Sequence, residues 1–308
     1  MSDIALRGPR RRSLQALPGW IGLAVVVFWL LVAVFAPLLS PHPPAAMLRL
    51  GTLAPSSVAA PFGTDVLGRD MLSRVIYGTR FTVGLALLAA VLASGIGSVL
   101  GILAAVLGGW ADSALSRSAD ALISIPHLMF ALVIVAALGS SLGVLVGLIA
   151  FSYVPGAFRI ARSLAANVNA MDFIQVARAR GEGTCYIVLH EILPNILLPV
   201  LTDFGLRFVF AVLLLSSLSF LGLGIQPPYA DWGALVRENI DGIYDAAPAV
   251  IAPAIGAPLL TLVSHLPKGY WRIGAPFYLC AILQAAALFL TILHFRSERR
   301  TQLAVDTG

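Results

Sequence analysis

Long apolar runs separated by short polar segments extend along almost the whole chain. A helix rises 1.5 Å per residue, so about 20 apolar residues are needed to cross a hydrocarbon core about 30 Å thick. Several runs reach this length, and the pattern therefore predicts membrane-spanning helices. We place the apolar runs at residues 19–40, 81–108, 121–139, 142–161, 197–221, 247–266 and 273–294.

The predicted fold class is all-α, a polytopic transmembrane helix bundle of six spans with an extra C-terminal apolar helix at 273–294. The first run is too long for a signal-peptide core and lacks a small-x-small cleavage site, so we expect it to be a retained span. Three parts follow: a cytoplasmic tail, first span and external linker (1–80), a transmembrane domain (81–266) and an atypical C-terminal helix and tail (267–308).

Small residues recur at every fourth position of the second span. Such a stripe lets another helix approach closely in lipid, because small side chains expose the backbone for van der Waals contact. The stripe predicts helix packing and does not identify a transported solute. Its members are Ala89, Ala93, Gly97, Gly101, Ala105 and Gly109.

The segment between the first two spans has two parts. Residues 41–61 are rich in Pro and small residues, which predicts an extended linker outside the membrane. In residues 67–80 the apolar side chains fall on one helical face, which fits a helix lying at the membrane interface. The alternative is that residues 67–80 are the start of the second span.

Composition agrees with a membrane protein. The chain has 308 residues, of which 59% are hydrophobic and 11% charged, and its mean hydropathy is +0.91. Soluble domains carry about 25% charged residues. The net charge of +5 does not indicate nucleic-acid binding, because the arginines lie at span ends rather than on one soluble face.

Arginines also suggest an orientation. Four of them precede the first span, which places the N-terminus in the cytoplasm, residues 162–195 inside and residues 222–246 outside. The external segment 41–80 also contains four arginines, and these oppose that orientation. The two sets are Arg7, Arg10, Arg11 and Arg12, and Arg49, Arg69, Arg74 and Arg80.

Several kinds of chemistry are not indicated. Cys185 and Cys280 have no paired spacing, so we interpret both as packing residues. No G-x-x-x-x-G-K-[ST] motif occurs, so ATP hydrolysis would require another subunit. The stretch that begins at His190 resembles H-E-x-x-H, but Pro194 stands at the second ligand position and no metal site is expected. A lone His127 is interpreted as a packed or interfacial residue.

A charged, glycine-containing segment interrupts the apolar pattern at residues 171–195. Residues 171–180 predict a short helix with Ile174, Val176 and Ala177 toward one side. Gly181 and Gly183 predict a turn with positive φ, and apolar periodicity then resumes up to Pro194. A projecting helix-turn-helix of this kind favours contact with a partner protein. The alternative is an ordinary loop between spans.

Asp203 and Arg207 lie within a predicted span. A charge at the centre of a membrane helix costs roughly 2.5 to 3.5 kcal/mol on insertion scales. The two residues are four apart, so they can neutralise each other on one helix face. One interpretation is that the pair faces the solute path and helps to select or gate the solute. The alternative is that the two charges only neutralise each other, with Arg207 extending toward the membrane surface or bonded to a neighbouring subunit.

The segment "DFIQVARARGEGTCYIVLHEILPNIL" resembles the EAA loop of binding-protein-dependent ABC transporter permeases. Gln175, Val176 and Ala177 occupy the E-A-A positions, and Gly181 occupies the glycine position. Three further stretches look like the dipeptide, oligopeptide and nickel branch of that family: residues 62–80, 118–139 and 218–233.

The resemblance implies an inner-membrane permease subunit of a bacterial importer for short peptides, or for nickel or a related small solute. Implied partners are a second homologous permease, two cytoplasmic ATPases that bind ATP and Mg²⁺, and an external solute-binding protein, with no cofactor on this chain. The implied ATPase-coupling residues are Asp172, Gln175, Val176, Ala177, Arg178, Ala179, Gly181 and Glu182. Further candidates for the solute path or gate are Ser219, Gly222 and Gly224.

The chain departs from the family pattern in three places. Leu215 and Gln175 replace acidic residues, and the tail from about residue 256 looks more like the final helix of a major-facilitator drug antiporter. These departures keep two alternatives open. One is a proton-driven secondary carrier or its fragment, and the other is a transport-inactive membrane scaffold.

Overall fold

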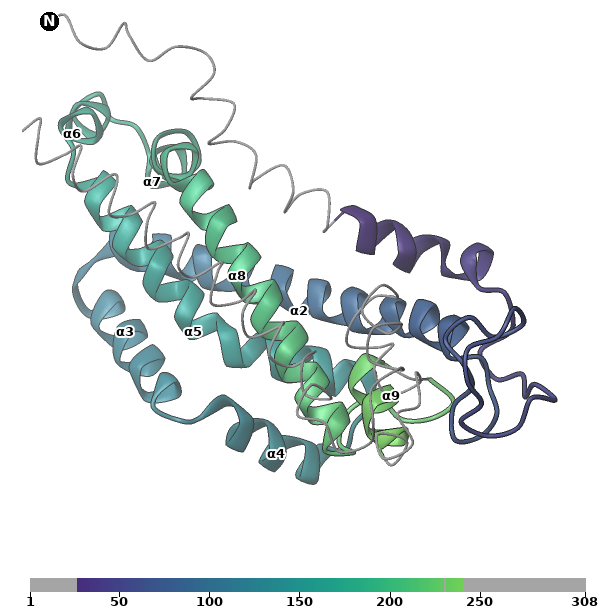
Figure 1. The fold of residues 1–308 in the computed structure, drawn as a ribbon. Helices are drawn as coiled ribbons and strands as arrows, with labels where there is room; N and C mark the ends of the chain where they lie inside the picture. Colours follow the sequence, from purple (N-terminus) through teal and green to yellow (C-terminus); the bar gives the residue numbers. More distant parts are fainter. Residues whose placement is uncertain (1–26, 230, 241–308) are drawn as a thin grey trace, which may run out of the picture. The chain divides into compact units, whose positions relative to one another are not determined.

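The computed structural model describes residues 27–229 and 231–240, and these residues form helices joined by short connections, apart from a long non-helical segment between Leu39 and Met71 (Figure 1). The only β-structure among them is two isolated bridges, Met47 with Arg69 and Thr64 with Asp70. The predicted all-α class is confirmed for this part of the chain. The apolar runs 247–266 and 273–294, Cys280 and the atypical tail 267–308 lie outside the described residues.

Three helical stretches are long and apolar enough to cross a membrane. They are α2 (Met71–Leu107), α5 (Leu142–Asn169) and the stretch Thr184–Phe220, which comprises α7 (Thr184–Tyr186), η1 (Ile187–Ile192) and α8 (Leu193–Phe220). A bent pair, α3 (Gly109–Ile123) and α4 (His127–Leu138), raises the number to four if the pair is one span. The described residues therefore show three or four of the six expected spans.

The predicted span 121–139 is not one continuous helix, and it corresponds to the end of α3 together with α4. The chain bends by 86° between α3 and α4. Pro126 lacks a backbone N–H and disfavours the helical region for Ile125, so the helix ends before the proline and a new one starts after it. The polar residues before 121, which were not assigned to a span, form most of α3.

Residues 67–80 do not form a separate interfacial helix. From Met71 onward they are the first turns of α2, which continues without a break to Leu107. This agrees with the second of the two sequence interpretations.

The small-residue stripe of α2 lies against α5. A Cβ built on Gly97 would be 2.6 Å from the Cβ of Ala157, and one built on Gly101 would be 2.6 Å from the carbonyl oxygen of Phe158. Ala89 and Ala93 are fully buried. The two backbones approach this closely because neither glycine carries a side chain.

One apolar core joins α2, α4, α5 and α8, with fully buried members such as Ala93, Ala131, Ile149 and Leu215. Outside that core, many large apolar side chains remain exposed on the long helices, for example Val99, Leu198 and Leu206. In a membrane such surfaces face lipid tails or another membrane subunit.

The helix Val27–Leu39 packs through Trp29 on the first residue of α9 (Trp232–Glu238). The ring centroids of Trp29 and Trp232 are 4.9 Å apart in an edge-to-face arrangement. Trp232 also donates through Nε1 to the carbonyl oxygen of Val75 in α2.

Pro194 does not end the helix that precedes it, contrary to the sequence prediction. Residues Ile187–Ile192 adopt π-helical geometry, and the N–H of Leu193 reaches back five residues to the carbonyl of Val188. A π turn shifts the hydrogen-bond pattern, and the chain then continues into α8 with Pro194 in its first turn, where a missing N–H costs little.

Residues 46–72 belong, together with residues 238–240, to a second compact unit. Residues 41–61, predicted as an extended linker, contain several turns, and a further set of turns follows near Asp65. One Asp65 oxygen accepts from the N–H groups of Leu67 and Arg69, and the other pairs with the Arg69 guanidinium. Thr64 holds the preceding turn by donating to the carbonyl of Gly51.

Candidate functional site

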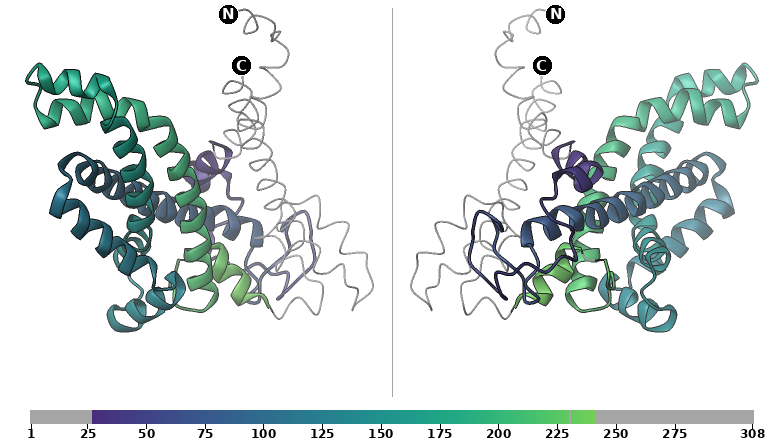
Figure 2. Two further views of the ribbon diagram at one scale, coloured as in Figure 1. Left: turned by 90° about the vertical axis from the view of Figure 1, so that its left-hand side faces the viewer. Right: turned by 90° about the vertical axis from the view of Figure 1, so that its right-hand side faces the viewer.

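The short helix α6 (Asp172–Ala179) lies beside α7 at one end of α5 and α8, far from α4 (Figures 1 and 2). Asp172 in its first turn and Arg178 in its last complement the helix dipole. Gly181 has φ +84°, and the N–H groups of Gly181 and Glu182 donate to the carbonyls of Arg178 and Ala177. This Schellman motif ends α6 as the sequence predicts, whereas Gly183 has φ −73°, so a positive φ there is wrong.

The buried face of α6 joins it to three longer helices. Ile174 and Ala177 are fully buried in a cluster with residues of α2, α5, η1 and α8, among them Ile102, Ala165 and Ile192. The short helix α6 is therefore packed directly against the long helices α2, α5 and α8.

A polar connection reinforces this attachment. Arg178 donates through Nη2 to the side-chain oxygen of Asn169 at 2.7 Å. Asn169 at the end of α5 in turn donates to the carbonyl of Ala105 in α2 at 3.2 Å. One residue of α6 is thus linked to both α5 and α2.

The opposite face of α6 is exposed. Val176 is 57% exposed, so its predicted place beside Ile174 and Ala177 is wrong, because 100° per residue puts it about 200° from Ile174. Gln175 and Ala179 are exposed, as are Phe173 and Cys185. The exposure of Cys185 also corrects its interpretation as a packing residue. Phe173 and Val176 thus leave apolar side chains exposed on this face of α6.

Asp203 and Arg207 form the pair that their spacing predicts. Arg207 donates through Nε and Nη2 to the two carboxylate oxygens of Asp203, at 3.1 and 3.0 Å. Both side chains are mostly buried. The guanidinium lies against Gly156 of α5, where any side chain would occupy the same space.

Arg207 faces a cavity of about 540 Å³ between α3, α5 and α8. This cavity is not lined by the other residues predicted for the solute path or gate, which are Asp203, Ser219, Gly222 and Gly224. The sequence pattern does not indicate this cavity, because its polar side chains come from three helices that are far apart in the chain. The spacing of Arg159 and Arg162 in an otherwise apolar span was the available signal.

Ser219, Gly222 and Gly224 build the turn that follows α8. Gly222 has φ +84°, and the N–H of Leu223 donates to the carbonyl of Leu218, which ends the helix. Gly224 lies so close to Ser219 that a Cβ would overlap the serine. Their placement is that of turn residues, and their part in a gate stays a prediction.

Asp231 was not singled out in the sequence, but it is fully buried beside this turn. Its Oδ1 accepts from the N–H of Ala234 at 3.1 Å, and among the described residues its Oδ2 has no hydrogen-bond partner. Burial raises the pKa of Asp231 from 3.8 to about 6, and the Ser219 hydroxyl and nearby backbone N–H groups lower it only in part.

Asp231→Asn is expected to stabilise the protein at pH 8 by about 2–3 kcal/mol and clearly less at pH 5. The folded-state pKa lies above the unfolded one, so the folded state loses stability as the pH rises from about 4 to about 6, and the full cost remains above that window. Thermal unfolding of both proteins in detergent between pH 5 and 8 measures the difference. A constant difference across this range would contradict burial as its cause.

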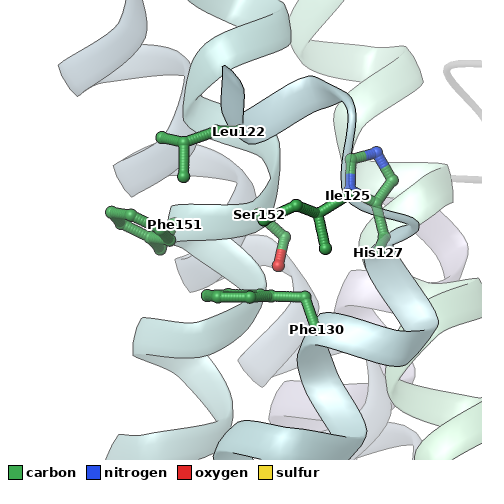
Figure 3. A pocket seen from close by; sticks show the side chains of 6 residues that line it. All are labelled: Leu122, Ile125, His127, Phe130, Phe151 and Ser152. Carbon is green, nitrogen blue, oxygen red and sulfur yellow. The ribbon is translucent and has the colours of Figure 1, made fainter. Parts of the chain in front are cut away.

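His127 lies at the bend between α3 and α4. Its ring meets Tyr153 edge to face with centroids 5.1 Å apart. Figure 3 shows the side chains around a space of about 10 Å³ at this bend, room for no more than one water molecule. The packing interpretation of His127 fits this geometry. The lining residues are Leu122, Ile125, His127, Phe130, Phe151 and Ser152.

Comparison with known proteins gives a consistent result. Residues 97–271 match the model of the family described as "binding-protein-dependent transport system inner membrane component". The chain is 35% identical to a putative peptide transport system permease protein of Brucella suis, over 85% of this chain and 86% of the relative.

Two other relatives are similar over most of their length. The dipeptide transport system permease protein DppC of Alkalihalophilus pseudofirmus is 35% identical over 79% of this chain and 80% of its own. The probable D,D-dipeptide transport system permease protein DdpC of Escherichia coli is 37% identical over 72% of this chain and 74% of its own.

Proposed function

The chain belongs to the family of binding-protein-dependent transport system inner membrane components, and from this we propose that it forms the solute path of an ATP-driven importer of short peptides. As an ABC permease of the peptide family it is a multi-pass inner-membrane transport subunit. The names of the relatives refer to peptides and dipeptides, which favours a peptide over nickel as the solute.

The observation that carries the proposal is the construction of α6. One face is buried against α2, α5, η1 and α8, and the other exposes Phe173 and Val176. A helix built in this way can receive a force from a soluble partner and transmit it to the membrane helices. We assign the exposed face, with Gln175, Arg178 and Glu182 beside it, to docking of a cytoplasmic ATPase.

The exposed apolar surfaces of α2 and α8 support a further membrane partner. A second, homologous permease would cover part of them, and the solute would pass between the two chains. Two ATPases, one for each coupling helix, and an external solute-binding protein complete the proposed assembly. In this arrangement Asp203 and Arg207 contribute to the solute path through the cavity that Arg207 lines.

ATP-driven uptake tests the class of transporter. The chain is purified together with the subunits that accompany it and is reconstituted in liposomes with the binding protein. We expect labelled dipeptide to accumulate about tenfold or more with ATP and Mg²⁺ and to remain near background with a non-hydrolysable nucleotide.

A proton gradient without ATP distinguishes the alternatives. Uptake driven by the gradient through this chain alone would identify a secondary carrier. Assembly with the partners but no uptake under any condition would identify a scaffold. Either result would contradict the proposal.

A further inference from the structure

A polar cavity lies among the membrane helices in the half of α5 nearer to α6. It measures about 540 Å³, which lies within the range of about 300 to 1,000 Å³ for small-molecule sites. Three guanidinium groups and one carboxylate line it, together with two serines. The lining residues that matter here are Ser116, Asp120, Arg159, Arg162, Ser163 and Arg207.

The three arginines differ in how firmly they are paired. Arg162 binds Asp112 of α3 through Nε and Nη2, the second hydrogen bond at 2.6 Å, so a carboxylate already neutralises its charge. Nη1 of Arg159 lies 3.9 Å from Oδ1 of Asp120, and the two side chains are 60% and 64% exposed. A pair so long and so exposed contributes little, so another carboxylate can replace Asp120 at small cost.

Arg207 supplies a second, more rigid donor. Asp203 occupies its Nε and Nη2 atoms, which leaves the hydrogens of Nη1 for another acceptor. Its guanidinium is fixed between Asp203 and the bare backbone at Gly156. A group held in this way loses little conformational entropy when it binds an anion.

We propose that this cavity binds the free C-terminal carboxylate of the transported peptide, through Arg159 and Arg207. The proposal rests on the proposed function and adds a specificity to it. Short peptides with different side chains share this carboxylate, so a site for it accepts many sequences while requiring a free terminus. Arginine suits the task because its planar fork can bind both carboxylate oxygens.

The test compares a dipeptide with its C-terminal amide in ATP-driven uptake by the reconstituted assembly. Arg159→Gln is expected to lower uptake of the free acid about tenfold and uptake of the amide by less than about twofold. The binding protein is the same in every assay. Its own preference for acid or amide therefore cancels when the uptake rate of each variant is divided by the wild-type rate for the same peptide. Arg159→Lys should restore part of the acid preference because the charge is retained.

Two further variants complete the design. The double variant Asp203→Asn with Arg207→Gln removes the second donor without leaving a buried charge unpaired, and it should reduce the acid preference in the same way. Arg117→Gln is the matched control, because Arg117 is exposed on α3 and does not line the cavity. It should leave both rates unchanged.

If Arg159→Gln lowers uptake of the acid and of the amide equally, the inference is overturned, and this is the result expected if the cavity holds a lipid phosphate. Unchanged uptake of the acid in Arg159→Gln would also overturn it. In both cases ATP-driven uptake by wild type still supports the proposed function. Absence of ATP-driven uptake in wild type would overturn the proposed function and the inference with it.

Discussion

Replacing Gly101 with Val is expected to prevent the chain from accumulating as a folded membrane protein. A Cβ at this position would be 2.6 Å from the carbonyl oxygen of Phe158 and 2.8 Å from the N–H nitrogen of Arg162. Both atoms belong to the backbone of α5 and cannot rotate away. Overpacking of a well-packed site costs about 1–3 kcal/mol, and a clash with backbone stands at or above the top of that range.

Membrane-fraction immunoblots and size-exclusion profiles in mild detergent measure the effect. Gly97→Val should behave similarly, since its Cβ would lie 2.8 Å from the carbonyl of Val154. The matched control is Gly95→Val in the same helix, because no atom lies within 4 Å of a Cβ there. Wild-type amounts of monodisperse Gly101→Val protein would show that α2 and α5 do not pack as described.

Replacing Val176 with Asp is expected to lower ATP-driven uptake by about tenfold or more while the chain remains folded. Val176 is 57% exposed on the face of α6 that is proposed to dock an ATPase, so a carboxylate would be desolvated in that contact without a partner. In the free chain the same carboxylate remains in water, so the free energy of unfolding should change little.

Retention of the ATPases during purification separates docking from later steps. Val176→Asp should lose most of the ATPase that accompanies wild type. Val58→Asp introduces the same charge at a fully exposed valine of the segment 46–72, and this variant should retain the ATPase. Equal retention in the two variants would mean that the exposed face of α6 is not the docking surface.

The parts of the fold that depend on local signals could be predicted from the sequence. Asp172, Arg178 and Gly181 mark the beginning and end of α6 through dipole and capping effects, which operate within one or two turns. The Asp203–Arg207 pair follows from i, i+4 spacing alone. The approach of α2 to α5 at Gly97 and Gly101 agrees with the four-residue stripe of small residues.

Features that depend on hydrogen-bond shifts or on contacts between distant segments were missed. The π turn before Pro194 and the sharp bend before His127 both depend on how the chain accommodates a proline. The helix continues through Pro194 but is interrupted at Pro126, and the sequence pattern does not distinguish continuation from interruption. The cavity requires α3, α5 and α8 to come together, and its Arg162–Asp112 pair joins residues 50 positions apart. Burial of Asp231 likewise results from tertiary packing.

Site-specific crosslinking from α6 tests the central claim most directly. A single cysteine at position 176 is introduced into a chain that carries Cys185→Ser and Cys280→Ser, which removes both native thiols. A photoactivatable thiol reagent is attached in cells, and the products are identified by mass spectrometry. We expect a P-loop ATPase as the main product from position 176 and none from a cysteine at Tyr229, an exposed residue beyond the other end of α8. Absence of an ATPase product from position 176 in cells that import peptide would contradict the account.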